Sequence, residues 1–270
     1  MKKYVINGLS YAVEIKGNGF PLLLLHGFTG AKENWEPFVA EWSSHFQLVM
    51  VDLIGHGETE QDATISRYKI ESLAKDLVTL MKEIGFSKFH VVGYSMGGRL
   101  ALTMAVLYPT VIKRLVLESS SPGLKTEDER HERQKKDQQL AERILMNGVA
   151  SFVEKWENIP LFATQKELPQ AVQQSVRRQR LLNSEQGLAQ SLLGMGTGSQ
   201  PSWWTHLSDI HTPVLLLVGE RDKKFCRLAK EMNKKLPDST ITVIKNVGHA
   251  IHVEEPKIFG KIVREFLTTT

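Results

Sequence analysis

The stretch that decides the fold is FHVVGYSMGGR, residues 89–99. Its first four residues are typical of a buried parallel strand, and the following LALTMA, residues 100–105, is typical of a helix. Between them, the pattern Gly93-x-Ser95-x-Gly97 places a serine on a tight strand-to-helix turn, where glycines remove side chains that would clash. We therefore predict that the Ser95 hydroxyl stands above a sheet, beside a helix amino end that favours negative charge.

Short apolar runs recur on both sides of this turn. They are rich in Leu and Val and bounded by glycine and polar residues, as buried parallel strands are. Segments with helical periodicity lie between the early runs, for example residues 70–84. This alternation predicts an α/β fold with a mostly parallel sheet and flanking helices. Besides residues 89–92, the expected strands are residues 22–25, 48–51, 115–117, 214–218 and 241–244.

The alternation stops between residues 122 and 206, where helix-forming segments replace the strand pattern. We therefore predict an α/β core of residues 1–121 and 207–270, interrupted by a helical insertion, here called the cap, of residues 122–206. Pro122-Gly123 marks one junction, and a glycine-rich segment ending at Pro201 marks the other. Helices are expected at residues 126–146, 169–182 and 185–193 in the cap, and at 227–236 and 256–267 after it.

The composition is that of an ordinary globular protein, with 270 residues and a formal net charge of +4. Basic and acidic residues interleave, which argues against a nucleic-acid site, and no apolar run approaches the roughly 18 residues of a membrane span. The single cysteine, Cys226, cannot form an intrachain disulfide, so we expect a cytoplasmic protein. The glycines at 194, 196 and 198 neither follow a strand nor open a helix, as a dinucleotide loop requires, and we expect no cofactor and no metal.

A serine nucleophile needs a base, and the base needs an acid that orients it. When the serine lies on this kind of turn, the acid and then the histidine follow it along the chain. Asp222 follows the run at 214–218 and His249 follows the run at 241–244, so both lie beyond strand ends, where α/β sites form. We therefore predict a catalytic set of Ser95, His249 and Asp222.

Other assignments compete with this set. Glu220 is an alternative acid, although it lies closer to the end of its strand. His252 is an alternative base, but Gly248 suits a tight turn that aims the imidazole of His249, so we expect a structural hydrogen bond from His252. His56, in a glycine turn after residues 48–51, is a minor catalytic candidate.

A developing oxyanion needs N–H donors that already point at it. One donor is expected from Met96, directly after the serine. The second is expected from Phe28, because His26-Gly27-Phe28 follows an early strand, although a simple strand-ending turn explains the glycine equally well.

Together these residues resemble the α/β-hydrolase superfamily over almost the whole chain. A closer similarity is to the 2-succinyl-6-hydroxy-2,4-cyclohexadiene-1-carboxylate synthases of menaquinone biosynthesis. It lies in GYSMGGR at 93–99, ESSSPGL at 118–124, ERHER at 129–133 and GERDKKF at 219–225. The resemblance implies a lyase that eliminates pyruvate from 2-succinyl-5-enolpyruvyl-6-hydroxy-3-cyclohexene-1-carboxylate, with the Ser–His–Asp set as base machinery and no acyl-enzyme.

The substrate that this resemblance implies is a small tricarboxylate, so its pocket must be cationic. The sequence itself favours Arg99, because a cation in the first turn of a helix opposes the helix dipole unless an anion compensates it. The alternative is a surface arginine whose stem covers the protein. The resemblance further implies Arg133 and Arg177 as carboxylate ligands and Tyr94 and Trp156 as pocket residues.

The local sequence leaves these last assignments open. Arg133 can instead pair with Glu129 one turn earlier on a solvated helix face. Nothing local selects among the three arginines of the next helix, Arg177, Arg178 and Arg180, and Arg178 replaces Arg177 if the alignment slips by one residue. Trp156 suits the core of the cap equally well.

Two other functions compete with the lyase. The same triad can act covalently in a serine esterase or thioesterase for a small carboxylate-bearing substrate. A non-catalytic binding protein on the same fold is the third hypothesis, and the complete set of triad candidates argues against it. The oligomeric state does not follow from the sequence, and a monomer is plausible.

Overall fold

The computed structural model describes residues 1–62 and 64–269, and a single sheet runs through them. The order of its strands is β1-β2-β4-β3-β5-β6-β7-β8. β2 is antiparallel to both of its neighbours, and the other neighbouring strands are parallel. The strands are β1 (Lys2–Ile6), β2 (Leu9–Lys16), β3 (Phe20–Leu25), β4 (Phe46–Val51), β5 (Phe89–Tyr94), β6 (Ile112–Glu118), β7 (Val214–Gly219) and β8 (Ser239–Ile244).

The sequence prediction of a mostly parallel sheet is confirmed, and six of these strands contain the six predicted runs. The hairpin of β1 and β2 was not predicted. β1 forms an edge of the sheet and is largely exposed, so it lacks a continuous apolar run.

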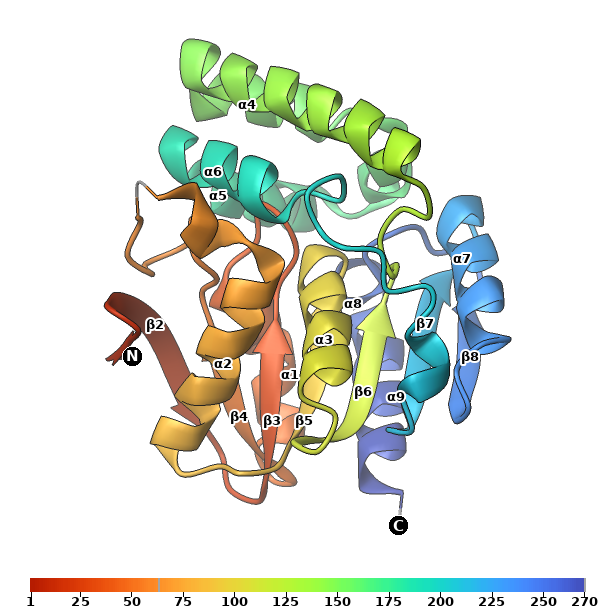
Figure 1. The fold of residues 1–270 in the computed structure, drawn as a ribbon. Coiled ribbons are helices and arrows are strands. Elements are labelled where there is room, and N and C mark those ends of the chain that lie inside the picture. Colours follow the sequence, from red (N-terminus) through yellow and green to blue (C-terminus); the bar gives the residue numbers. More distant parts are fainter. Residues whose placement is uncertain (63, 270) are drawn as a thin grey trace.

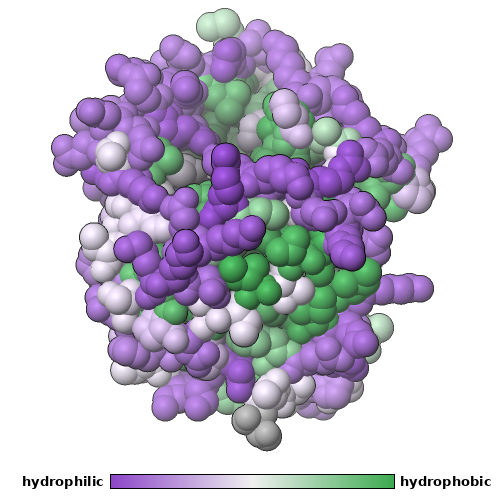
Figure 2. Space-filling view, turned by 90° about the vertical axis from the view of Figure 1, so that its right-hand side faces the viewer, coloured by the Kyte–Doolittle hydropathy of each residue, from purple (hydrophilic) through white to green (hydrophobic). Residues whose placement is uncertain are grey.

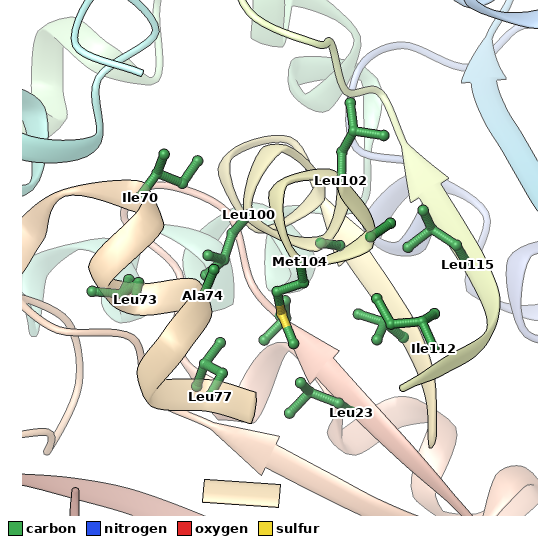
Figure 3. Packing of buried hydrophobic residues seen from close by; sticks show 14 of the residues in the cluster. Leu23, Ile70, Leu73, Ala74, Leu77, Leu100, Leu102, Met104, Ile112 and Leu115 are labelled. Carbon is green, nitrogen blue, oxygen red and sulfur yellow. The ribbon is translucent and has the colours of Figure 1, made fainter. Parts of the chain in front are cut away.

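Helices cover both faces of the sheet (Figure 1). Buried residues of α2, α3 and α7 join one core cluster, and those of α1, α8 and α9 join the other. In the first cluster, Leu73 and Leu77 of α2 lie beside Leu100 and Met104 of α3, with Leu23 of β3 next to them (Figure 3). These helices are α1 (Glu36–Trp42), α2 (Ile70–Ile84), α3 (Met96–Leu107), α7 (Lys223–Asn233), α8 (Ile251–Glu254) and α9 (Pro256–Thr268).

Between β6 and β7 the chain forms helices that lie over the end of the sheet to which the parallel strands point (Figure 1). They are α4 (Glu127–Trp156), the 3-10 helix η3 (Pro160–Glu167), α5 (Gln170–Leu181) and α6 (Glu185–Met195), here called the inserted helices. α4 begins with a capping box between Thr126 and Glu129 and bends at Gly148, which has a φ of 78°. α4 and α6 pack around a small core of their own that includes Ile144 and Leu188. The division into a core and a cap at residues 122 and 206 stays a prediction.

The surface is mainly hydrophilic around these helices. Figure 2 views the side of the molecule that lies on the right in Figure 1 and shows polar side chains over its upper part, with an apolar area below its centre. Within the part of the chain that the structure describes, no helix combines the length and the apolar composition needed to cross a membrane.

Candidate active site

Ser95 lies between β5 and α3 with a φ of 49°, a left-handed conformation that is unusual for a residue with a side chain. The neighbouring glycines explain how the turn fits. A Cβ atom on Gly93 would lie 2.4 Å from the carbonyl oxygen of Gly97, and one on Gly97 would lie 2.2 Å from that of Leu25. The predicted strand–turn–helix arrangement around Ser95 is therefore present.

The structure brings the three predicted triad residues together. His249 Nδ1 lies 2.6 Å from Asp222 Oδ2, and His249 Nε2 lies 3.0 Å from Ser95 Oγ. With Nδ1–H donating to the carboxylate, Nε2 is free to accept the serine proton. Asp222 also accepts the N–H of Phe225 at the start of α7, 3.2 Å away, which fixes the carboxylate at the end of β7.

The competing residues have other partners. Glu220 accepts the backbone N–H of Asn246 at 3.1 Å. His252 bonds the buried Glu118 through its ring Nδ1, 2.9 Å from Oε2, as expected of a structural histidine. His56 is buried, and burial followed by the nearby His26 lowers its pKa to about 3, so its ring is neutral at neutral pH.

A cavity of about 550 Å³ opens at Ser95. It lies between the end of the sheet and the inserted helices, which contribute part of its wall. Most of the predicted site residues line it, on both sides. They are Phe28, Tyr94, Ser95, Met96, Arg99, Arg133, Trp156 and His249.

The two predicted oxyanion donors lie on this cavity. Met96 is the first residue of α3, so its N–H has no acceptor within the helix. Phe28 follows β3, and Gly27 before it is close-packed, since a Cβ atom there would lie 2.6 Å from the ring of Tyr94. His26 holds the next loop by accepting the N–H of Leu53 at 3.0 Å.

Arg99 is the most deeply buried cation of the cavity wall, with 9% of its surface exposed. Its Nη1 donates to two uncharged oxygens, the carbonyl of Met195 at 2.7 Å and Oε1 of Gln200 at 2.5 Å. Burial, reinforced by the neighbouring Arg133 and opposed by Asp137, lowers the pKa of Arg99 to about 10. Arg99 is thus a charged donor at neutral pH whose neighbours leave the charge largely uncompensated.

Arg133 has one acidic partner. Its Nε lies 2.8 Å from Oδ1 of Asp137, one turn later on α4. The alternative pairing with Glu129 is wrong, because Glu129 accepts the N–H groups of Lys125 and Thr126 in the capping box instead. Asp137 itself is buried, and its Oδ2 has no hydrogen-bond partner among the described residues.

Arg177 is placed outside this cavity. It pairs with Glu157 and lines a separate hollow on the outer side of α5, while Arg178 lines a third one between α5 and η1 (Lys32–Trp35). Arg180 is also absent from the wall of the Ser95 cavity. It lines the same hollow as Arg177 and a small neighbouring one that Phe162 shares with it, where it is buried, donates to Gln165 at 3.0 Å and lies 4.6 Å from the ring centroid of Phe162. The signal that could have selected Arg180 is its position four residues after Val176, on the apolar stripe of the helix.

Sequence reasoning also missed Lys224 and two serines in the cavity wall. Lys224 lies in the first turn of α7, where it opposes the helix dipole as Arg99 does, so the same argument could have found it. Burial and the nearby Arg133 lower the pKa of Lys224, against the effect of Asp222. Ser119 and Ser120 line the cavity with buried hydroxyls that have no partner among the described residues.

Trp156 lies between the two alternatives that the sequence left open. Its ring packs edge-on against the rings of Phe28 and Phe162, at centroid distances of 5.5 Å and 5.7 Å, and it also lines the cavity. Trp156 is therefore both a packing residue and a pocket residue. The indole Nε1 is buried without a partner in the described part of the chain.

Burial raises the pKa of Tyr94, so its phenol keeps its proton.

Residues 21–256 match the family model described as the alpha/beta hydrolase fold, and the chain belongs to this family. A Bacillus subtilis (strain 168) protein, provisionally named a 2-succinyl-6-hydroxy-2,4-cyclohexadiene-1-carboxylate synthase, is 46% identical and covers 98% of this chain and 97% of its own length. The synthase of that name from Salmonella paratyphi C (strain RKS4594) is 33% identical over 87% of this chain and 88% of its own length. The chain belongs to this synthase family.

Solved structures agree with these relatives. The structure of MenH from S. aureus superposes with a TM-score of 0.90 at 34% identity, covering 95% of this chain and 97% of its own. A malate-bound thermophilic esterase from Thermogutta terrifontis gives a TM-score of 0.88 at 26% identity, with 98% and 97% covered.

Proposed function

We propose that the chain is a carbon–oxygen lyase that eliminates pyruvate from 2-succinyl-5-enolpyruvyl-6-hydroxy-3-cyclohexene-1-carboxylate, giving 2-succinyl-6-hydroxy-2,4-cyclohexadiene-1-carboxylate. One observation carries the proposal beyond family membership. The serine of a Ser–His–Asp set opens into a cavity whose wall contains a buried arginine held only by uncharged oxygens. Such a site favours an anionic ligand, because an anion supplies the charge that the protein does not.

The charge of the cavity wall fits a tricarboxylate. Five basic residues line it against two acidic ones. Lys125 and Glu231 form an ion pair with each other, and Glu129 is engaged in the capping box. Of the other four basic residues, Arg227 lies near Glu231 and, after Lys125, helps to lower the pKa of that carboxyl, so we propose Arg99, Arg133 and Lys224 as the carboxylate ligands. Arg177 stays a prediction from the family resemblance, and Arg180 is the alternative on α5, because it lies over the ring of Phe162, which lines the cavity.

The proposed reaction begins with loss of the ring proton next to the succinyl ketone. His249 accepts the Ser95 proton, and the Ser95 oxygen takes the proton from the ring carbon. The N–H groups of Phe28 and Met96 stabilise the enolate that forms. The electron pair of this ring enolate then forms the new ring double bond, and the carbon–oxygen bond to the enolpyruvyl group breaks. The departing enolate takes up a proton and becomes pyruvate.

An esterase acting through an acyl-enzyme is the second candidate. The geometry of the triad supports the esterase as well as the lyase. The oxygen of Ser95 lies 3.0 Å from His249, which Asp222 orients, and it can also attack an ester carbonyl. Its tertiary structure is also similar to that of the malate-bound esterase. A small carboxylate-bearing ester would meet the same cations.

One experiment separates the two. Purified protein is incubated with the enolpyruvyl substrate and, separately, with a p-nitrophenyl ester, and pyruvate is measured with a coupled dehydrogenase. We expect one pyruvate per substrate consumed, and a loss of about 10³-fold or more in Ser95→Ala. No pyruvate above background, together with rapid ester hydrolysis, would overturn the lyase and favour the esterase.

We propose that this activity takes place in the cytoplasm and that the partner of the protein is its small-molecule substrate. The support for the cytoplasm is the single cysteine, which cannot form an intrachain disulfide.

A further inference from the structure

The 3-10 helix η3 contacts the segments that carry the acid and the base of the triad. Phe162 is the first contact, with its ring edge-on to that of His249 at a centroid distance of 6.2 Å. η3 belongs to the inserted helices, whereas Asp222 and His249 follow strands of the sheet. The contact therefore joins two parts of the fold that are far apart in sequence.

The second contact is a carboxylate that grips the chain on both sides of His249. Glu254 Oε2 accepts the N–H of Gly248 at 2.7 Å, and Oε1 is 3.4 Å from the N–H of Ala250. The same Oε1 accepts the hydroxyl of Thr164 from η3 at 3.0 Å. Thr164 is packed against the turn itself, since a Cβ atom on Gly248 would lie 2.1 Å from its Oγ1.

The third contact lies beside the triad acid. Arg221, directly before Asp222, forms a two-fold hydrogen bond with the carboxylate of Glu167 at the end of η3, with both distances 2.7 Å. The backbone N–H of Arg221 bonds the carbonyl of Val247, 2.9 Å away. This arginine pair is exposed, so we expect it to contribute less than the buried Thr164 contact.

We propose that η3 positions the Asp222–His249 pair, and that Glu254 is the positioning residue through which Thr164 holds the His249 turn. A carboxylate that accepts N–H groups before and after one residue fixes the direction of that residue's side chain. The hydroxyl of Thr164 adds a tie that exists only while η3 is in place. The inference rests on the proposed role of His249 as base, and it does not depend on which substrate the enzyme uses.

This arrangement predicts a defect in turnover without a defect in binding. Among the described residues that line the Ser95 cavity, neither Thr164 nor Glu254 is present. Loss of the hydrogen bond between Thr164 and Glu254 would let the imidazole of His249 move. Small displacements of a catalytic group lower the rate strongly. We therefore expect kcat to fall while KM stays nearly constant.

The test compares Thr164→Val, which keeps the shape and removes the hydroxyl, with Thr164→Ser, which keeps the hydroxyl. We expect kcat for pyruvate release to fall about 10-fold in Thr164→Val with KM within about twofold, and to stay near the wild-type value in Thr164→Ser. Thr212→Val is the matched control, because Thr212 is equally buried and bonds Ile112 at the opposite end of the sheet. Glu254→Gln tests the same tie from the other side, and its loss should not add to that of Thr164→Val.

A second readout needs no substrate. We expect the proton between His249 and Asp222 to give a low-field NMR signal that is lost in His249→Gln. Thr164→Val and Glu254→Gln should shift this signal, and Thr212→Val should leave it unchanged. Wild-type kcat and an unshifted signal in folded Thr164→Val and Glu254→Gln would overturn the inference, as would additive losses in the double variant. Failure of wild-type protein to release pyruvate would instead overturn the lyase, and the NMR comparison would still decide the role of η3.

Discussion

Two buried cations, Lys32 beside the sheet and Arg99 in the cavity wall, have opposite surroundings. Lys32 is 3% exposed, and its Nζ lies 2.8 to 3.0 Å from the carboxylates of Glu33, Asp52 and Glu58. Arg99, at 9% exposed, donates to uncharged oxygens only. Burial by itself lowers the pKa of both, but in Lys32 the hydrogen bonds to Glu33, Glu58 and Asp52 outweigh it and raise the pKa.

We expect the difference to separate a structural charge from a binding charge. The charge of Lys32 is compensated by the three carboxylates around it, and the residue ties the η1 turn to Asp52 after β4. Arg99 carries a charge that the fold does not neutralise. A bound carboxylate would supply to Arg99 the counter-charge that Lys32 already receives from the protein. Substitutions at the two positions should therefore differ in kind, in stability at one and in substrate recognition at the other.

The largest effect is expected from Lys32→Met. Removing this ammonium leaves the fully buried Asp52 without its counter-ion, and breaking such a pair typically costs about 3–5 kcal/mol. Urea denaturation should show this loss in the free energy of unfolding, while KM of the remaining folded enzyme is unchanged. The exposed Lys88→Met serves as control, with a change below about 0.5 kcal/mol. A loss of unfolding free energy below about 1 kcal/mol in Lys32→Met would show that Lys32 does not have the structural role that distinguishes it from Arg99.

Arg99→Met should act on the substrate instead. Truncating a buried charge that pairs with a ligand carboxylate typically costs about 2–5 kcal/mol, so kcat/KM for the tricarboxylate should fall about 100-fold or more. Hydrolysis of a neutral p-nitrophenyl ester should change far less, and the loss of unfolding free energy should be smaller than that of Lys32→Met. Arg99→Lys should restore only part of the rate, because a lysine lacks the planar fork. Equal losses on both substrates would mean that Arg99 is structural.

Arg133 lies between these extremes, with one carboxylate partner in Asp137 and a half-exposed side chain. Arg133→Gln should lower kcat/KM for the tricarboxylate by about 10-fold, because part of the charge is compensated and solvated. Arg130→Gln, one turn earlier on α4 and paired with Glu127, is the matched control and should leave the kinetics unchanged. Steady-state assays of both variants should measure kcat/KM with the tricarboxylate and with the ester. An unchanged kcat/KM in Arg133→Gln would show that Arg133 does not bind the substrate.

The smallest effect is expected from Lys224→Gln. The ammonium lies 5.5 Å from the ring centroid of Phe225 in the wall of the cavity, and an exposed charge typically contributes below about 1 kcal/mol. KM should rise about threefold at low salt, and the difference from the wild type should shrink as salt is added. Lys223→Gln, its exposed neighbour on the chain, should show no such salt-dependent difference. Identical KM values for the two variants across the salt range would contradict a role for Lys224.

The sequence could predict the sheet and the triad because both depend on local patterns. The apolar runs are typical of parallel strands covered by helices, and Ser95, Asp222 and His249 each follow one of them. The hairpin of β1 and β2 was not predicted because β1 is largely exposed and β2 mixes polar with apolar residues. Lys224 stands in the first turn of α7, where the dipole argument for Arg99 applies equally, and Arg180 differs from Arg177 and Arg178 only in the face of α5 that it occupies.

By itself, the sequence determined where Ser95 stands, since only glycine fits at Gly93 and Gly97, two residues before and two residues after it. It also determined which residues form the acid–base pair, through their positions after β7 and β8. The tertiary structure alone decided which cations face the cavity and which are neutralised. Lys32 has one acidic neighbour along the chain, Glu33, but the carboxylates of Asp52 and Glu58 reach it only in the folded structure, and Arg99 receives uncharged oxygens instead. Charge compensation depends on distances between residues remote in sequence, and only folding sets those distances.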